Sequence, residues 1–429
     1  MNYTQTTEYL FSAMPSFQNV GGSAYKPGLE RIEAFCKLLG DPHKSYPVIH
    51  VAGTNGKGST SHMLASVLQS AGYRVGLFTS PHLRDFRERM RIGADMISKE
   101  DVVDFVASHR DEMEQLNLSF FEMTAAMAFD FFACSNVDIA VVETGLGGRL
   151  DATNIIDPEL SIITNIGIDH TQYLGTTLPE IAAEKAGIIK CARAVVVGER
   201  VEEYRSVMEQ KAADMGSDLV YATDSRAVTG VEYRADRQLV TLNCRGEERV
   251  YSLDLMGAYQ THNLMTLLSA IDVINAKEEI KIEISQEAID RGLNSVMVST
   301  SLCGRWQTIS ESPKIICDTG HNSHGLREVT RQLAMQQYSK LYCVLGFARD
   351  KNLREILPLF PKDCHFIFTR AKVERAFTTA EIAEVARDLG LEFNLVDGVV
   401  EALAFARSSA KEATDLIFIG GSNFVIAEV

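Results

Sequence analysis

Hydrophobic and polar positions along the chain follow two repeating patterns. Short apolar runs rich in β-branched residues recur at strand length, and stretches with helical periodicity lie between them. This alternation is typical of an α/β fold with a mostly parallel sheet. The clearest unit comprises a strand at 48–52, a glycine-rich break at 53–58, a helix at 59–71 and a strand at 75–79.

The first cycle of strands and helices continues to about residue 298. Its further buried strands are predicted at 137–142, 160–164 and 194–197. Between 218 and 255 the pattern changes to short alternating segments separated by polar turns, which predicts a small antiparallel β insertion. Helices at 260–275 and 285–298 are predicted to follow the insertion.

The pattern restarts near residue 300, which predicts a second, smaller doubly wound domain. Its strands are predicted at 314–317, 341–345, 365–368 and 416–419. Its helices are predicted to begin near Ser323, Asn352, Thr379 and Val399. A chain of 429 residues is longer than one hydrophobic core usually supports. We therefore predict two domains, at 1–298 and 299–429, with the polar segment 299–304 as the linker.

Composition and charge narrow the classes of partner. The chain has 46% hydrophobic and 23% charged residues, and no apolar run approaches the roughly 20 residues that span a bilayer. Its net charge of −15 disfavours binding to nucleic acid, so an anionic substrate requires a local basic patch. Residues 1–14 lack the basic start of a secretory signal and are predicted as a short helix. Eight scattered cysteines without a CxxC pair indicate reduced thiols in a cytoplasmic protein.

A glycine-rich segment between the first strand and its helix is the strongest chemical signal. It consists of Gly53, Thr54, Asn55, Gly56, Lys57, Gly58 and Ser59. Glycines in this position let backbone N–H groups approach phosphate oxygens, and Lys57 neutralises charge on the outer phosphates. A simple glycine-rich turn is the alternative. The segment departs from the general P-loop because Val51 replaces a glycine and Gly58 follows the lysine. The magnesium-binding hydroxyl therefore comes from Ser59 or from elsewhere.

Glu143 is a candidate metal ligand. It closes the apolar strand at 137–142 and opens a segment with glycines at 145, 147 and 148. Phosphoryl-transfer enzymes hold a metal ion with an acid at the carboxyl end of a buried strand next to the P-loop strand. Strand-end acids are also often only solvated or helix-capping. The glycines favour the metal role because they suggest backbone lying close against a ligand.

Single basic residues form weaker signals. His170 follows a predicted strand, but a lone histidine is more often structural. Lys185 ends a predicted helix and, on periodicity alone, is a surface residue. Arginines at 87, 89 and 91 would share one side of an extended strand, where they could bind carboxylates or form a solvated face.

A polar segment directly follows the first predicted strand of the second domain. Ligands of open α/β sheets lie at the carboxyl ends of strands, so Asp318 and His321 are candidates for nucleotide contact. Capping of the next helix by Asn322 explains the motif equally well.

In this order, the segments resemble the folylpolyglutamate synthase and dihydrofolate synthase branch of the Mur ligase superfamily. The resemblance extends from Gly28 to Ser422, nearly the whole chain. Its most specific segments are residues 53–59, 79–83, 145–154 and 184–187. The glycine after the P-loop lysine is usual in this branch, whereas the cell-wall Mur ligases carry threonine or serine there.

The resemblance implies a ligase that uses ATP and magnesium. A P-loop domain, with a mostly parallel sheet and a small antiparallel insertion, would precede a smaller Rossmann-like glutamate-ligase domain. The implied reaction joins L-glutamate to dihydropteroate, or to a reduced folate that already carries glutamate, through an acyl phosphate with release of ADP and phosphate. Many bacterial relatives resemble both enzymes at once. The match of Phe121, Asp151 and Ala152 to the pterin-holding pattern favours both activities here. The family also implies a monomer.

The resemblance further implies roles for individual residues. Lys57, Lys185 and His170 would be catalytic, with Lys185 carbamylated. Carbamylation would replace an ammonium that repels the metal by a negatively charged oxygen ligand. The remaining implied roles are magnesium binding by Ser80, Glu143 and His170, ATP contact by Asn263, Arg305, Asp318 and His321, pterin contact by Phe121, Asp151 and Ala152, and glutamate contact by Arg89 and Ser422.

Three departures from the family pattern concern local backbone shape. Cys303-Gly304-Arg305 replaces Pro-Gly-Arg, Leu264 replaces an alanine, and residues 318–323 differ from Asp-Gly-Ala-His-Asn-Pro. Other functions stay open from the sequence. They are a monofunctional folylpolyglutamate synthase, a Mur-type ligase acting on a cell-wall precursor, and a nucleotide-dependent switch or binding module, for which the P-loop alone would suffice.

Overall fold

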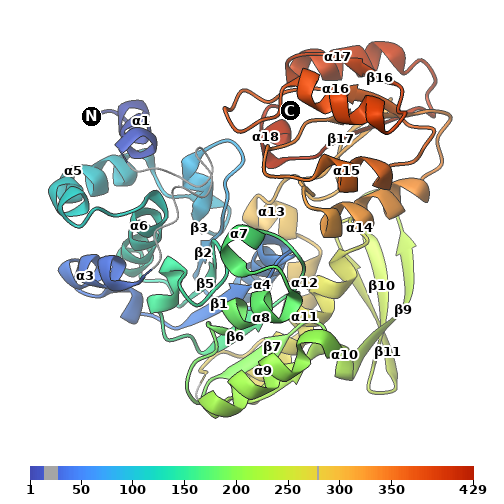
Figure 1. Cartoon of the computed structure of the whole chain (residues 1–429). Coiled ribbons are helices and arrows are strands. Elements are labelled where there is room, and N and C mark those ends of the chain that lie inside the picture. Colours follow the sequence, from blue (N-terminus) through green and yellow to red (C-terminus); the bar gives the residue numbers. More distant parts are fainter. Residues whose placement is uncertain (14–27, 278–279) are drawn as a thin grey trace. The chain divides into compact units, whose positions relative to one another are not determined.

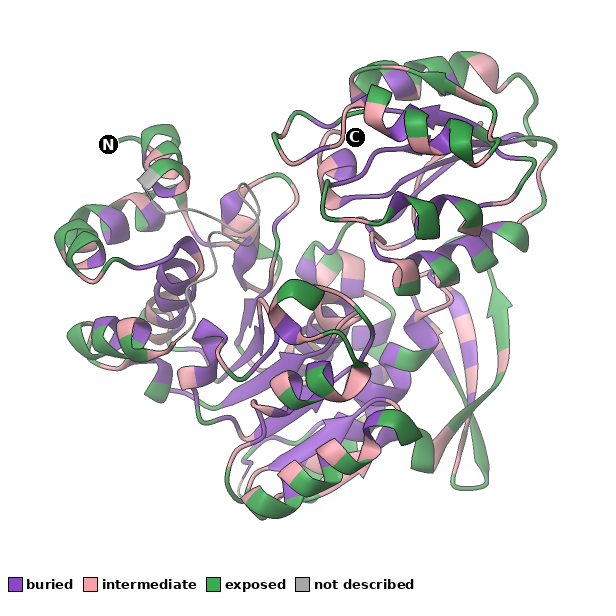
Figure 2. Cartoon of the chain, in the orientation of Figure 1, coloured by how far each residue is buried: buried purple, intermediate pink, exposed green. Residues whose placement is uncertain are grey.

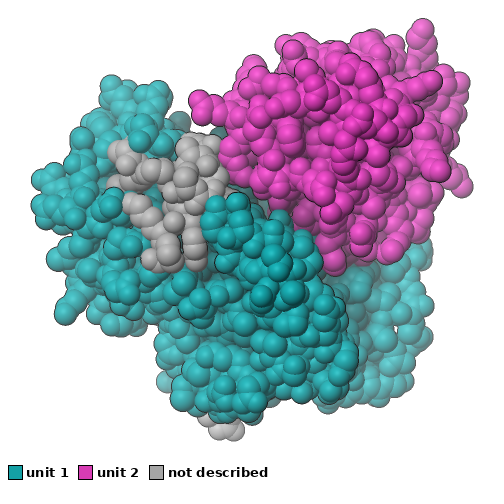
Figure 3. Space-filling view, viewed as in Figure 1, with its two compact units in different colours: residues 1–254, 260–302 teal, residues 255–259, 303–429 magenta. Residues whose placement is uncertain are grey.

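The described residues form three β-sheets in two units (Figure 1). The structure is a computed structural model that describes residues 1–13, 28–277 and 280–429. Unit 1 comprises residues 1–254 and 260–302, and unit 2 comprises residues 255–259 and 303–429 (Figure 3). The chain passes between the units after residues 254, 259 and 302.

The large sheet of unit 1 is parallel except at one edge. Its order is β4-β3-β2-β5-β1-β6-β7-β8, with antiparallel pairing only at β2-β3 and β3-β4. Its strands are β1 (Val48–Ala52), β2 (Val75–Phe78), β3 (Met90–Ile92), β4 (Asp95–Met96), β5 (Ile139–Glu143), β6 (Leu160–Ile163), β7 (Ala194–Val197) and β8 (Leu219–Tyr221). The five parallel strands predicted from apolar runs are thus confirmed.

Helices cover this sheet and complete the core of unit 1. They are α1 (Tyr3–Ala13), α3 (Glu30–Leu38), α4 (Lys57–Ser70), α5 (Lys99–Gln115), α6 (Phe120–Cys134), α7 (Thr171–Leu174), α8 (Leu178–Ala186), α9 (Glu202–Met215), α10 (Ala222–Ser225), α11 (Gln260–Ala276), α12 (Gln286–Leu293) and α13 (Val296–Thr300), with the 3-10 helices η2 (Pro42–Lys44), η3 (Phe86–Arg89) and η4 (Ala152–Ile155). α4 packs on β1, β2 and β5, and α11, α12 and α13 pack against α4. Residues 59–68 of α4 are all buried, so this is a core helix (Figure 2).

The predicted β insertion forms a separate three-stranded antiparallel sheet in the order β11-β10-β9. Its strands are β9 (Arg226–Tyr233), β10 (Gln238–Cys244) and β11 (Glu247–Leu253). The start of the predicted insertion is wrong, because β8 joins the large sheet parallel to β7. The crossover helix α9 lies between β7 and β8, and such a crossover produces a parallel pair.

Unit 2 contains the smaller doubly wound domain. Its sheet has the order β12-β13-β17-β14-β15-β16, antiparallel only at β12-β13. The strands are β12 (Gln307–Glu311), β13 (Lys314–Cys317), β14 (Leu341–Leu345), β15 (His365–Phe368), β16 (Phe393–Leu395) and β17 (Leu416–Gly420). The helices are α14 (Ser323–Ala334), α15 (Leu353–Ile356), α16 (Thr379–Asp388), α17 (Val399–Ser409) and α18 (Asn423–Ala427), with η5 (Leu357–Leu359). All four predicted strands and all four predicted helix starts are confirmed, whereas β12 and β16 were not predicted.

Two predicted helices differ in extent from the observed ones. The helix predicted at 285–298 is divided into α12 and α13, because Ser295 leaves helical geometry at φ −140 and ψ 23. The short helix predicted at 1–14 is α1, and Met14 lies outside the described residues. None of the helices in the described part of the chain is both long and apolar enough to cross a bilayer.

The start of α6 depends on a buried carboxylate. Ser119 Oγ accepts the N–H of Glu122 at 3.2 Å, and Glu122 Oε2 accepts the N–H of Ser119 at 2.7 Å. Arg31 of α3 donates to Glu122 Oε1 at 3.0 Å. Because Glu122 is 3% exposed, loss of its carboxylate leaves a buried N–H and a partly buried guanidinium without this partner.

We predict that Glu122→Ala lowers the free energy of unfolding by about 2 to 4 kcal/mol. Glu180→Ala is the matched control, because Glu180 forms the same reciprocal cap at α8 in an exposed position. In urea denaturation, the decrease in the free energy of unfolding for Glu180→Ala should be less than half of the decrease for Glu122→Ala. Equal losses would contradict the role of burial.

Candidate functional site

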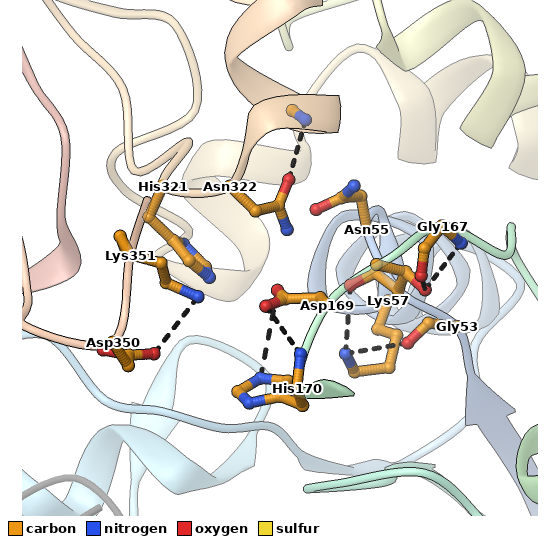
Figure 4. A network of polar contacts seen from close by, with 12 residues as sticks. Gly53, Asn55, Lys57, Gly167, Asp169, His170, His321, Asn322, Asp350 and Lys351 are labelled. Carbon is orange, nitrogen blue, oxygen red and sulfur yellow. Dashed lines mark hydrogen bonds and ion pairs between the residues drawn. The ribbon is translucent and has the colours of Figure 1, made fainter. Parts of the chain in front are cut away.

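The glycine-rich segment forms a loop between β1 and α4 that is tied to the segment after β6. Thr54 N donates to the carbonyl of Asn165 at 2.9 Å, and Asn55 N donates to Asn165 Oδ1 at 2.8 Å. The hydroxyl of Thr54 donates to the carbonyl of Gly167 at 3.0 Å and accepts its N–H at 2.9 Å (Figure 4). The P-loop is therefore held in shape by hydrogen bonds of the protein itself.

Helix α11 packs against the same loop. Gln260 Nε2 donates to Ser59 Oγ at 3.1 Å, and Gln260 Oε1 accepts from Asn263 Nδ2 at 2.8 Å. Gly56 has φ +82, and a Cβ at this residue would lie 2.2 Å from Asn263 Oδ1. Position 56 thus requires glycine both for its backbone conformation and for space. The structure brings Asn263, a predicted ATP contact, next to the P-loop.

Two lysine side chains meet at one carbonyl oxygen. Lys57, the first residue of α4, donates its Nζ to the carbonyl of Gly53 at 3.1 Å (Figure 4). Lys185 of α8 donates to the same oxygen at 2.8 Å. The surface position suggested by periodicity is wrong for Lys185, which is 2% exposed because α8 turns it towards the P-loop. Burial, and then the charge of Lys57, lower the pKa of Lys185 to about 7, while Asp169 and Asp151 oppose this shift.

Glu143 and Ser80 lie together at the carboxyl ends of β5 and β2. Ser80 N donates to Glu143 Oε2 at 3.2 Å, and Glu143 is 3% exposed. Magnesium commonly takes one or two carboxylates together with substrate phosphates and water. In the part of the chain that the structure describes, no three His, Cys, Asp or Glu side chains gather as a metal-binding group. The buried carboxylate of Glu143 is the kind of group that binds magnesium when a substrate and water supply the other ligands.

His170 directly precedes α7 and has a left-handed backbone at φ +49. Its Nε2 lies 3.9 Å from the carboxylate of Asp169, and its N–H donates to Asp169 Oδ1 at 2.9 Å (Figure 4). Oxygen ligands suit magnesium better than imidazole does. Asp169 places such an oxygen group directly beside the predicted histidine ligand, and its charge also acts on Lys185.

Asp151 organises the glycine loop after β5, residues 144–151. Its Oδ2 accepts the backbone N–H groups of Gly145 at 2.9 Å and Leu146 at 2.8 Å. Its Oδ1 accepts the N–H of Thr153 at 3.1 Å and the hydroxyl of Thr153 at 2.5 Å. Burial raises the pKa of Asp151, and the hydrogen bond from the Thr153 side chain is the largest opposing effect. The carboxylate thus closes the loop by four hydrogen bonds.

The other two residues predicted to hold a pterin lie at the same loop. A Cβ on Gly145 would lie 2.5 Å from the ring of Phe121, so this aromatic ring lies directly against the loop. Ala152, buried at 6% exposure, is the first residue of η4. The structure therefore brings Phe121, Asp151 and Ala152 to one segment.

The arginine row predicted at 87, 89 and 91 is wrong as one face of a strand. Asp85 and Glu88 form a capping box that begins η3, and β3 starts only at Met90. The three arginines consequently have different partners. These are the carboxylate of Asp85 for Arg87, Nδ1 of His82 for Arg89 and the carbonyl of Ala94 for Arg91.

Arg89, the predicted glutamate contact, is 3% exposed. Its guanidinium lies 5.3 Å from the centre of the Phe120 ring. Burial lowers the pKa of Arg89 to about 10, and the carboxylates of Glu143 and Glu88 oppose this shift. The positive charge of Arg89 therefore acts on the predicted metal ligand Glu143.

In unit 2, Asp318 follows β13 and connects three segments. Its Oδ2 accepts the hydroxyl of Tyr259 at 2.6 Å and the N–H of Trp306 at 2.8 Å. Its Oδ1 accepts the N–H of Gly320 at 2.7 Å. Burial raises the pKa of Asp318, opposed first by the hydrogen bond from Tyr259. Asp318 thus has a structural role whether or not it contacts a nucleotide.

Arg305 and His321 both contact Thr319, so they lie close to Asp318. Arg305 donates to the hydroxyl of Thr319, and His321 Nδ1 lies 3.0 Å from the carbonyl of Thr319. Asn322 caps α14 through its side-chain oxygen, which confirms the capping alternative (Figure 4). Ser422, 5% exposed, caps the short helix α18 with its hydroxyl oxygen.

Comparison with known proteins assigns the family. Residues 51–271 match the Mur ligase middle domain, and residues 304–423 match the Mur ligase glutamate ligase domain. The dihydrofolate synthase/folylpolyglutamate synthase of Bacillus subtilis is 33% identical over 427 residues, which cover 94% of this chain and 94% of that protein. The chain belongs to this branch of the Mur ligase family.

Two further relatives define how far the similarity reaches. Escherichia coli FolC in complex with DHPP and ADP has a TM-score of 0.82 at 29% identity, covering 100% of this chain and 96% of that chain. A probable bifunctional folylpolyglutamate synthase/dihydropteroate synthase of Haloferax volcanii is 32% identical over 438 residues. The match covers 100% of this chain but only 50% of that protein, so the chain spans about half of its length. The predicted family resemblance and α/β fold class are confirmed.

Several site residues of this Mur ligase family member were not predicted. They are Asn165, Gly167 and Asp169 after β6 and Gln260 on α11. A usable signal was present for the first three, because they follow a buried strand that pairs with β1. No local pattern marks Gln260, whose role depends on the packing of α11 onto the P-loop.

We predict that Gly56→Ala lowers ADP affinity about tenfold or more, because a methyl group there collides with Asn263 and displaces the loop. Gly72→Ala is the matched control. Gly72 follows the other end of α4 at φ +97, but nothing lies within 4 Å of its added Cβ. Isothermal titration with ADP should show near-normal affinity for Gly72→Ala, and equal losses would refute the steric explanation.

We predict that Lys185 makes stability depend on pH above neutrality. The folded state releases its proton near pH 7, whereas the unfolded state keeps it to about pH 10. Between these values the unfolded state binds more protons, so the stability contributed by Lys185 rises with pH, by up to roughly 1.4 kcal/mol per pH unit. Urea denaturation in buffer freed of carbon dioxide should show this rise relative to Lys185→Met. A constant difference from pH 7 to 9 would contradict it.

Proposed function

We propose that this chain joins L-glutamate to the carboxylate of a pterin-bearing acid and converts ATP to ADP and phosphate. The convergence of Lys57 and Lys185 on the P-loop carbonyl of Gly53 carries the proposal. Two lysine side chains at one oxygen suit a site for phosphate, and the N-terminus of α4 adds favourable backbone N–H groups. The names of the B. subtilis and E. coli relatives support the choice of substrates.

ATP binding begins at the P-loop, residues 53–59. Lys57 exchanges the carbonyl of Gly53 for the outer phosphates, and the backbone N–H groups contact phosphate oxygens. Family resemblance extends the proposed ATP contacts to Asn263, Arg305, Asp318 and His321. Of these, Asn263 has direct structural support because it lies against Gly56.

Glu143, Ser80 and His170 are the proposed magnesium ligands. When bound, magnesium would offset negative charge on the phosphates. The N–H of Ser80 orients the Glu143 carboxylate through a hydrogen bond. The positive charge of Arg89 interacts favourably with the negative charge of Glu143. Asp169, next to His170, would supply an oxygen ligand that magnesium prefers.

Lys185 is the proposed site of carbamylation. Only the neutral amine reacts with carbon dioxide, forming an N–C bond and releasing one proton. A pKa lowered to about 7 leaves a substantial neutral fraction at physiological pH. The product is a carbamate anion, which removes the repulsion between two ammonium groups and attracts both Lys57 and a metal ion.

Phe121, Asp151 and Ala152 are the proposed pterin contacts. The Phe121 ring offers a flat apolar surface at the glycine loop, and Asp151 is a carboxylate that accepts N–H groups. Arg89 and Ser422 remain the proposed contacts for glutamate. We propose both activities, dihydrofolate synthase and folylpolyglutamate synthase, because the relative from B. subtilis carries both names.

The proposed reaction has two steps. A carboxylate oxygen of the acceptor attacks the γ-phosphorus of ATP, and ADP leaves with the electrons of the broken P–O bond. The α-amine of glutamate then attacks the acyl carbon, loses a proton and displaces phosphate. The protein supplies positioning, charge compensation and exclusion of water. Little covalent chemistry is required of its side chains.

The proposed environment of the enzyme is the cytoplasm, and its partners are small molecules. None of the eight cysteines, all of which lie in the described part of the chain, is in a disulfide bond, which supports a reducing compartment. A monomer is proposed from the family resemblance.

We predict that the purified protein with ATP, magnesium and glutamate adds glutamate both to dihydropteroate and to tetrahydrofolate. Each acceptor is offered separately, and products are weighed by mass spectrometry. Addition only to the reduced folate would indicate a monofunctional folylpolyglutamate synthase. Addition only to a nucleotide-linked muramyl acceptor would indicate a cell-wall ligase, and ADP release that ignores every acceptor would indicate a switch or binding module.

The variant Lys57→Ala tests the role of the P-loop in the same assay. Loss of its charge should lower turnover about 100-fold or more, because the charge developing on the phosphates is no longer neutralised. Normal turnover by Lys57→Ala would overturn the assignment of the P-loop.

A further inference from the structure

His50 is a fully buried histidine that the proposed mechanism does not use. It lies in the middle of β1, three residues before the P-loop, and pairs in register with Val142 of β5 and Ser161 of β6. Side chains two apart on a strand share a face. Val48 and Ala52, on either side of His50, belong to apolar core clusters. His50 is therefore a polar side chain between two apolar ones on the same face of β1, and core packing alone does not require a histidine there.

A continuous line of hydrogen bonds runs from His50 to the glycine loop. His50 Nε2 lies 2.8 Å from Thr153 Oγ1, and Thr153 Oγ1 lies 2.5 Å from Asp151 Oδ1. The other oxygen of Asp151 accepts the N–H groups of Gly145 and Leu146. The strand that leads into the P-loop is thereby connected, through two side chains, to the loop that meets Phe121.

The donors and acceptors in this line have one preferred order. A hydroxyl has a single proton, so if Thr153 donates to Asp151, His50 must donate from Nε2 to Thr153. The reverse order would put the proton of His50 on Nδ1, where the described residues offer no hydrogen-bond partner. A buried N–H without an acceptor is costly. The line therefore runs from His50 to Thr153 to Asp151.

His50 acts in this line as a neutral donor. Burial, and then the charge of Lys190, lower its pKa to about 3. The imidazole thus stays neutral at physiological pH and does not exchange protons as an acid or base. Its contribution is geometric, because it holds the Thr153 oxygen in place so that the hydroxyl proton points at Asp151.

We propose that His50 and Thr153 are positioning residues that align the acceptor-binding glycine loop with the P-loop, and this inference rests on the proposed function. Asp151 holds two backbone N–H groups of the loop with one oxygen and accepts the N–H and the hydroxyl of Thr153 with the other. Without an oriented hydroxyl from Thr153, this buried carboxylate loses one of four hydrogen bonds. The loop then moves relative to Gly53 and the phosphates, and the acceptor carboxylate leaves its line of attack.

Two replacements of His50 separate positioning from simple core packing. His50→Gln places a side-chain N–H where Nε2 stands, three bonds from Cβ. His50→Asn places its N–H where Nδ1 stands, two bonds from Cβ, and cannot reach Thr153. Both are polar amides smaller than histidine, and they differ by one methylene group and by the position of the donor. Thr153→Val and Thr153→Ser form a second pair that removes or keeps the hydroxyl.

The experiment measures KM for the pterin acceptor and KM for ATP in the ligase assay for all four variants. We expect His50→Asn and Thr153→Val to raise the acceptor KM about tenfold while the ATP KM changes less than about twofold. We expect His50→Gln and Thr153→Ser to stay within about threefold of the wild type. Equal increases in both KM values, or equal behaviour of the two amides, would overturn the proposal.

An NMR measurement tests the same line without catalysis. Imidazole ¹⁵N shifts of histidine-labelled protein should identify His50 as the neutral Nε2–H tautomer from pH 5 to 8. The Nδ1–H tautomer would refute the proposed donor order. A wild-type protein that is inactive with every acceptor but shows the Nε2–H tautomer would remove the proposed function, and the positioning role with it, while leaving the hydrogen-bond line in place. The two failures are thus distinguishable.

Discussion

Two lysine side chains of unit 1 donate to one backbone carbonyl oxygen, and the repulsion between their charges constrains the P-loop site. Lys57 and Lys185 both donate to Gly53, and within residues 1–13, 28–277 and 280–429 the acceptors of both side chains are backbone carbonyls. Lys185 is buried and Lys57 is half-buried, and two ammonium groups at such a site are unfavourable unless one loses its proton or an anion binds between them. The lowered pKa of Lys185 relieves this repulsion because it favours loss of one proton. A bound triphosphate, or a carbamate on Lys185, would relieve it by adding negative charge. This constraint explains why a phosphate-binding function follows from the site.

The P-loop is held by elements that lie far away in the chain. The segment after β6 supplies its hydrogen-bond partners, and α11 supplies the side chain that requires glycine at position 56. Such a loop has little conformational entropy to lose when it binds phosphate. The geometry of the nucleotide site is therefore a property of the whole parallel sheet, because β6 lies directly beside β1.

The glycine loop after β5 follows the same physical logic with a carboxylate at its centre. Asp151 satisfies backbone N–H groups that would otherwise be unpaired, and buried polar groups of this kind require partners. The hydrogen bonds from His50 through Thr153 to Asp151 connect this loop to β1, the strand that leads into the P-loop. The loop proposed to bind the acceptor and the P-loop are thereby both connected to β1, and such a connection favours the meeting of two reactants at a defined distance.

Much of this arrangement was present in the sequence alone. Apolar runs separated by helical stretches determined the parallel strands, since a strand buried on both faces must be apolar. The glycine-lysine segment predicted phosphate binding, and the acid at the end of β5 led to the prediction of a metal ligand, because both kinds of group are used for this chemistry at strand ends. Only the tertiary structure decided that Lys185 is buried, that the three arginines separate, and that His50 joins Asp151. These outcomes depend on contacts between residues 100 or more positions apart, for Lys185 and Gly53 as for His50 and Thr153, or on one local cap such as Asp85 and Glu88. Periodicity reports which face of an element is apolar, and it carries no information about which distant polar group will meet that face.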